Sequence, residues 1–189
     1  ILSDTHQNKY PVAVPCYLGG NETARVYRAL QQHDDNSRLL EHIEQDLFHI
    51  SISSEDLDAD SDLAQTTFQP KQNVWCYKPT TYCYNTSTKR LYLHCEHTWA
   101  DGGALKGIVT LAASKLAARG GKKTRPAVHR YEWQLDANLL KNWAQWQQNY
   151  TKQADQMHVT SVTIPFNGLT IPQGMSQDAL MQFLLQYAQ

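Results

Sequence analysis

The residue with the clearest capacity for chemistry is His97, which stands where a predicted strand ends. An imidazole has an unperturbed pKa of about 6.5, so it can take and return a proton near neutral pH, as a general base must. A side chain on a loop between a strand and a helix faces a cleft more readily than a solid core. We therefore predict that His97 lies at a cleft and works as a general base.

Two elements must position this histidine, one on each side. Residues 91–96 alternate apolar and polar side chains, which predicts a strand that ends at the histidine. An Asp-Gly-Gly turn follows at residues 101–103. Apolar side chains then recur with helical spacing over residues 105–116, and Gly120 and Gly121 end the pattern.

The spacing of His97, Asp101 and Gly102 gives the chain an H-x-x-x-D-G pattern, which resembles the signature of CoA-dependent acyltransferases. The longer string over residues 96–102 is similar to the E-H-S/T-x-x-D/E-G segment of choline and carnitine acyltransferases. This resemblance implies transfer of an acyl group between acyl-CoA and a small quaternary-ammonium alcohol such as carnitine or choline. His97 would take the proton of the alcohol in one direction and of the CoA thiol in the other. Coenzyme A is thus expected as a co-substrate, and no metal is expected.

The same resemblance assigns a supporting role to Asp101. Its carboxylate could pair with the imidazole and hold its tautomer, or it could pin the turn through a buried ion pair, and both roles stay open. Gly102 and Gly103 would let the backbone turn tightly beside the pocket, at a φ that other residues resist. Trp99 would form pocket wall or core. Trp99, Gly102 and Gly103 are therefore candidate substrate-binding residues.

Other segments of the chain resemble segments of the family and occur in the same order, but some of their residues differ. Gln7 stands where the family's I-L-T-x-x-H-R segment has arginine. Val74 replaces the arginine of its N-R-W-F/Y-D-K segment, and the aspartate of that segment is either replaced by Tyr77 or missing. Residues 167–174 lack the lysines that contact CoA phosphates in the carnitine enzymes. Two alternatives stay open: an H-x-x-x-D-G acyltransferase with a different acceptor, and a non-catalytic module related to these enzymes.

The order of elements predicts an α/β fold with a mixed β-sheet flanked by helices. The resemblance implies a chloramphenicol-acetyltransferase-like half of a two-domain enzyme, with the catalytic histidine in residues 1–165 and the start of a second domain in 166–189. The expected strands span residues 47–53, 73–77, 80–84, 91–96, 128–135 and 158–164. Helices are expected from residue 22, after residues 35–36, over 105–116, after Asp136 and after Ser176. The acidic stretch 54–72 should be a solvated surface excursion.

Composition and charge exclude several classes of protein. The 189 residues are 41% hydrophobic and 19% charged, which is ordinary for a globular protein. A formal net charge of -1 gives no basic field for nucleic acid or an anionic membrane. No run approaches the length of a transmembrane helix. Because the sequence opens with Ile, we expect a piece of a longer protein. We expect that protein in the cytoplasm or an organelle matrix.

The cysteines and the neighbouring histidines favour neither a disulfide framework nor a metal site. Cys16, Cys76, Cys83 and Cys95 lack C-x-x-C spacing, so free thiols are expected, most of them buried. His94, Cys95 and His97 could suggest a metal centre. Adjacent residues of a strand point to opposite faces, however, so the three cannot converge on one ion without distortion.

Overall fold

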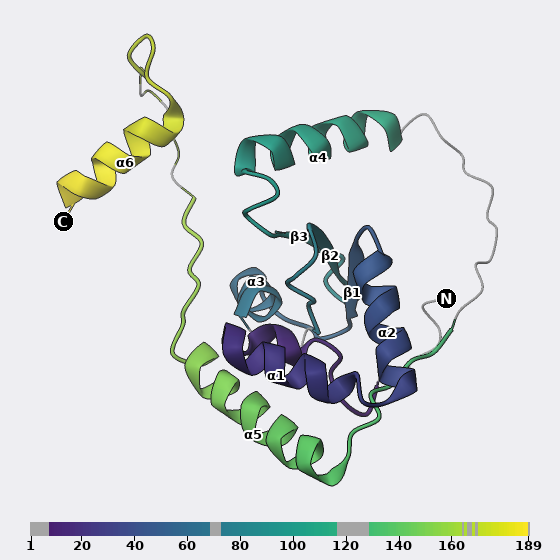
Figure 1. Ribbon diagram of the computed structural model, residues 1–189. Helices are drawn as coiled ribbons and strands as arrows, with labels where there is room; N and C mark the ends of the chain where they lie inside the picture. Colours follow the sequence, from purple (N-terminus) through teal and green to yellow (C-terminus); the bar gives the residue numbers. More distant parts are fainter. Residues whose placement is uncertain are drawn as a thin grey trace. The chain divides into compact units, whose positions relative to one another are not determined.

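The computed structural model describes residues 8–68, 73–116, 129–163, 165, 168 and 170–188. It divides into two compact units, residues 1–159 and 160–189, and confirms the mixed α/β class (Figure 1). The elements in order are η1 (Val14–Tyr17), α1 (Gly20–Leu30), α2 (Asp34–Gln45), β1 (His49–Ser53), α3 (Ala59–Phe68), β2 (Thr80–Asn85), β3 (Leu91–Cys95), α4 (Gly102–Leu116), α5 (Ala137–Ala154) and α6 (Gln177–Ala188). Within the described residues, none of the helices has the length and apolar character needed to cross a bilayer.

The sheet has three strands in the order β1-β2-β3. β1 runs parallel to β2, with Ile52 opposite Tyr84, and α3 lies in the connection between them. β2 and β3 pair antiparallel, with Tyr82 opposite Leu93, and form a hairpin. The sheet is therefore mixed, with one parallel and one antiparallel pair of strands. The parallel pair needs the long crossover that contains α3, whereas the antiparallel pair needs only a short turn.

The hydrophobic core of the first unit lies among η1, α1, α2 and α5. Leu30 and Leu40 are fully buried on the inner faces of α1 and α2, and Trp143 of α5 packs against Trp133. The predicted cap of α5 is confirmed, since a carboxylate oxygen of Asp136 accepts hydrogen bonds from the amides of residues 138 and 139, each at 2.8 Å. Periodic apolar positions and a local cap were sufficient to specify this helix.

β1 departs from the expectation of a core strand. Its outward residues are apolar, and Ile50 and Ile52 are more than half exposed, whereas Ser51 is buried. On β2 the buried side chains are Thr81, Cys83 and Asn85. Period-two alternation thus predicted the strand correctly but not which face the protein covers.

The expected strand at residues 73–77 is wrong, because this segment is a loop. Asn73 has a φ of 52°, which leaves the extended region of a strand. Its side-chain oxygen accepts the amide proton of Ala13 at 2.8 Å. Lys78 is buried at the end of the loop, and its Nζ donates to the carbonyl oxygens of Glu44 and Asp46 at 2.7 and 2.6 Å.

The two remaining strand predictions are also wrong over the residues that the structure describes. Residues 129–135 and 158–163 form no β-ladder, and residues 128 and 164 lie outside the described range. Near residue 134 a side chain takes the place of a neighbouring strand. Asn36 Nδ2 donates to the carbonyl of Gln134 at 2.8 Å, and Asn36 Oδ1 accepts its amide proton at 2.7 Å.

The second unit, residues 160–189, contains α6. Its N-terminus is capped as predicted, since the Ser176 hydroxyl accepts the amide proton of Ala179 at 3.0 Å. Apolar side chains along the helix, including Phe183 and Leu185, are exposed.

Candidate active site

The turn that carries His97 is fixed from both sides by hydrogen bonds. The amide of Glu96 donates to the carbonyl of Pro79 at 3.2 Å, next to the start of β2. The amide of Trp99 then donates to the carbonyl of Glu96 at 3.2 Å, which closes the turn. Between these two bonds the side chain of His97 is exposed. The predicted strand-to-helix junction is therefore present, with the imidazole open to solvent.

Glu96 gives the turn a fixed negative charge beside the imidazole. Its carboxylate accepts hydrogen bonds from the amide of Thr98 at 3.1 Å and from the Thr98 hydroxyl. These bonds lower the pKa of Glu96 below its ordinary value, and the nearby charge of His97 lowers it further. The turn therefore carries an ionised carboxylate next in sequence to the candidate base.

Asp101 is the N-terminal capping residue of α4. Its Oδ1 accepts the amide proton of Ala104 at 2.8 Å, and its backbone carbonyl accepts that of Leu105 at 3.1 Å. The carboxylate is exposed, so the buried ion pair considered for it is not present here. It satisfies one of the amides that a helix start leaves without a partner.

The two glycines after Asp101 lie in the first turn of α4 and do not have positive φ, so the expected left-handed turn is wrong. A Cβ added at Gly103 would lie 3.3 Å from Asp101 Oδ1, whereas one added at Gly102 would meet nothing within 4 Å. Glycine at position 103 therefore leaves room for the capping carboxylate.

Beside the turn, Trp99 is 53% exposed, so it is not core. A cavity of about 380 Å³ opens on β3 just before the histidine. Its lining comes from α3, β3 and the first turn of α4, namely Leu63, Thr66, Tyr92, Leu93, His94, Cys95 and Leu105. Among residues 102–115 of α4, Leu105 is half-buried and the others are exposed.

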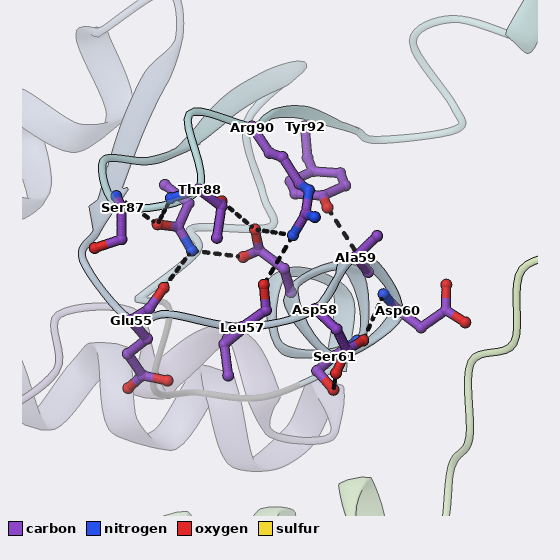
Figure 2. Close-up of polar contacts among 12 residues, drawn as sticks. Glu55, Leu57, Asp58, Ala59, Asp60, Ser61, Ser87, Thr88, Arg90 and Tyr92 are labelled. Atoms are coloured by element: carbon purple, nitrogen blue, oxygen red, sulfur yellow. Dashed lines mark hydrogen bonds and ion pairs between the residues drawn. The ribbon is translucent and has the colours of Figure 1, made fainter.

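The hairpin that leads to His97 is held by a polar cluster around Asp62 of α3. Asp62 is 1% exposed and accepts hydrogen bonds from Asn85 Nδ2 at 3.1 Å and from the Thr88 hydroxyl at 3.0 Å. Arg90 lies 3.9 Å from the same carboxylate and donates to the carbonyl of Leu57 at 2.8 Å. Figure 2 shows how Thr88 and Arg90 of the hairpin lie against the segment that leads into α3. This cluster joins α3 to the turn between β2 and β3.

The expectation that residues 54–72 form only a solvated excursion is thus wrong for Asp62. Asp58, in contrast, is exposed and caps α3, since its Oδ1 accepts the amide protons of Asp60 and Ser61 at 3.0 and 2.9 Å. Once the cap starts the helix there, Asp62 is placed one turn later. Five acidic residues within one segment gave no signal as to which of them would be buried. Residues 69–72 lie outside the described range.

The sequence did not reveal a group of two thiols and one imidazole, in which Cys16 and Cys76 meet His94 of β3. The amide of Cys76 donates to the sulfur of Cys16 at 3.3 Å, although the two residues are 60 positions apart. The pKa of Cys76 is lowered by hydrogen bonds from Cys16 and His94. The same bond raises the pKa of His94. All four cysteines are free thiols, as expected, and Cys83 alone among them is fully buried.

The similarity of the chain to a known family extends over its whole length. A family model described as Choline/Carnitine o-acyltransferase matches residues 1–189, which include both the candidate site and its flanking elements. A search of curated proteins found no match. Among the described residues, no group of three or more His, Cys, Asp or Glu side chains has an arrangement that could hold a metal ion.

Proposed function

The chain belongs to the choline/carnitine O-acyltransferase family, and from that premise we propose that His97 is the general base of a CoA-dependent acyl transfer. The acyl group would move between acyl-CoA and a small hydroxylated quaternary amine, carnitine or choline. Family membership supports the acyltransferase class for this chain, and the acceptor and the base are our assignments.

The observation that carries the proposal is the exposed imidazole on a turn that is fixed at both ends. In the forward direction His97 takes the proton of the acceptor hydroxyl as its oxygen attacks the thioester carbonyl. A new C–O bond forms, the C–S bond breaks, and the CoA thiolate receives the proton from His97. Glu96 supports the site through the turn, because its carboxylate accepts hydrogen bonds from the amide and the hydroxyl of Thr98, the residue after His97.

We assign Asp101 a positioning role through the helix cap. By accepting the Ala104 amide it fixes the start of α4, five residues after His97. Gly103 permits that geometry, since a side chain there would crowd the carboxylate. Trp99 and Gly102 are exposed beside the turn and are proposed to contact substrate, the indole as an apolar wall.

The test is thiol release from acetyl-, octanoyl- and palmitoyl-CoA, with carnitine or choline as acceptor. We expect acceptor-dependent release that falls by roughly 10²–10⁴-fold in His97→Ala, the usual contribution of a general base. His158→Ala removes an exposed histidine outside the site and should leave the rate unchanged. A His97→Ala rate within tenfold of the parent, roughly, would remove His97 from the mechanism.

Two Asp101 variants separate the cap from the charge. Asn is a good capping residue without a formal charge, so Asp101→Asn should keep most of the activity if the carboxylate acts through the cap. Asp101→Ala should lose activity together with protection of the first α4 amides from hydrogen exchange. Equal loss of activity in both variants, with α4 intact, would instead assign the role to the charge.

A non-catalytic module is the second candidate, and one observation favours it. Val74, where the family segment has arginine, is 1% exposed, and its backbone exchanges hydrogen bonds with the Tyr17 hydroxyl at 3.2 and 3.3 Å. The position is thus structural in this chain. A folded chain that binds acyl-CoA and shows no acceptor-dependent thiol release would support this second function.

A further inference from the structure

A second reactive group lies apart from the turn of His97, and none of its three side chains is assigned a role in the acyl transfer. Cys16 belongs to η1, Cys76 to the loop before β2, and His94 to β3. The three come from parts of the chain that are far apart in the sequence, so their meeting is a product of the tertiary fold.

Hydrogen bonds hold the two cysteine segments against each other. The Ala13 amide donates to Asn73, and the Tyr17 hydroxyl donates to the carbonyl of Val74 at 3.2 Å. Between these contacts the Cys16 sulfur accepts the Cys76 amide proton at 3.3 Å. That amide nitrogen is bonded to the Cα of Cys76, so the sulfur already lies against the residue that it would have to reach.

The two thiols differ in how readily they ionise, and this difference suits an attacking cysteine and a second cysteine that forms the disulfide with it. Hydrogen bonds from Cys16 and His94 favour the thiolate of Cys76 and lower its pKa. Burial raises the pKa of Cys16, which keeps it a thiol. A thiolate is the nucleophile in thiol oxidation, and a neighbouring thiol can then resolve the product. His94 also lines the cavity of about 380 Å³, which gives a small molecule a route toward the group.

We propose that Cys16 and Cys76 form a reversible, peroxide-responsive disulfide, with Cys76 as the attacking and Cys16 as the resolving residue. The Cys76 thiolate attacks one oxygen of hydrogen peroxide, the O–O bond breaks, and a sulfenic acid forms as the leaving hydroxide takes a proton from His94. The Cys16 thiol then attacks the sulfenic sulfur, the S–O bond breaks, and the hydroxide leaves as water with the proton of Cys16. Two thiols and one peroxide thus give one disulfide and two waters.

The test is titration of the reduced, intact chain with hydrogen peroxide, followed by alkylation and peptide mapping without reduction. We expect a linked peptide that joins Cys16 to Cys76, a loss of two hydrogen masses, and recovery of both thiols with dithiothreitol. Cys83 should stay reduced at the same dose, because burial raises its pKa to about 12. Oxidation of Cys83 or Cys95 at equal or lower peroxide, or a linked peptide that contains either of them, would overturn the proposal.

Single substitutions test the role that we propose for each residue of the group. Cys16→Ser should stop the reaction at a Cys76 sulfenic acid that a dimedone-type probe labels. His94→Gln should slow oxidation of Cys76 by roughly tenfold, since it removes a partner of the thiolate. Cys95→Ser is the matched control and should form the linked peptide as the parent does. A circular dichroism spectrum like that of the parent establishes that each variant is folded, and a folded parent without the linked peptide contradicts the proposal.

Discussion

Single polar side chains take the place of missing backbone partners at several points of this chain. Lys78 donates to two carbonyl oxygens at the end of α2, where a helix leaves such groups without partners. Asn36 pairs with both backbone groups of Gln134, and Asp101 caps α4. A buried or terminal backbone group without a partner is costly, so these residues matter through the backbone they satisfy.

His49 is one of the residues that tie stability to pH. Its ring stacks near Trp75, and its pKa is lowered by burial. Within the part of the chain that the structure describes, its buried Nε2 has no hydrogen-bond partner. Because the pKa is lower in the folded than in the unfolded state, the unfolded chain binds more protons as the pH falls below about 6.5, and stability decreases there.

We therefore predict that His49→Phe reduces the loss of stability on going from pH 8 to pH 5. The ring keeps its contact with Trp75 but no longer titrates, and the change should be under about 1 kcal/mol after solvent screening. Urea unfolding at both pH values measures it, with His158→Phe as an exposed control. If the pH dependence of His49→Phe equals that of the parent, burial of His49 does not contribute to it.

At the scale of elements, α3 and the β2–β3 hairpin depend on one buried carboxylate. Asp62 accepts from Asn85 and Thr88, and the same asparagine donates to the carbonyl of Glu55 at 2.8 Å. Tyr92 at the start of β3 adds a hydrogen bond to the carbonyl of Ala59 at 3.3 Å (Figure 2). Since β3 runs directly into the turn of His97, the cluster helps to fix the position of the candidate base.

We predict that Asp62→Ala lowers the free energy of unfolding by about 3 kcal/mol, because it leaves a buried amide, a hydroxyl and a guanidinium without their partner. Hydrogen exchange should rise in the hairpin before it rises in α1 or α2. Asp56→Ala, at an exposed acidic residue of the same segment, should change stability by less than about 0.5 kcal/mol. Equal effects of the two substitutions would mean that the buried cluster contributes little.

For the molecule as a whole, the two faces of the sheet differ in an unusual way. The covered face carries Ser51, Thr81 and Asn85, and the apolar side chains of β1 stand on the other face. The main core instead lies among helices, where Leu40 and Trp143 are 1% exposed. The helical core, more than the sheet, should therefore dominate the stability of the first unit.

This contrast predicts opposite results for two apolar substitutions. Leu40→Ala should lower the free energy of unfolding by about 2–5 kcal/mol, because it leaves a cavity in the core. Ile52→Thr replaces a side chain that is 51% exposed with another good strand former, so it should change stability by less than about 0.5 kcal/mol. Urea denaturation of the two variants makes the comparison. A larger loss in Ile52→Thr would show that the exposed sheet face is covered in solution.

The local sequence determined most helices of this protein and the junction that carries the candidate base. The apolar periodicity of α2 and α5, the caps at Asp136 and Ser176, and the strand and turn around His97 each depend on residues within a few positions of one another. Interactions of this range are encoded in the sequence itself, so spacing alone was enough to find them.

Only the tertiary structure decided which distant groups meet. The alternation at residues 129–135 gave no strand, because Asn36 of α2 occupies the backbone that a neighbouring strand would have paired. Asp62, among several acids, is buried because the hairpin brings Asn85 and Thr88 to it, and Cys16 meets Cys76 because η1 is hydrogen-bonded to the loop before β2. Each of these contacts joins residues at least 23 positions apart, and pairing over such a distance is fixed by the packing of whole elements and not by the spacing of neighbours.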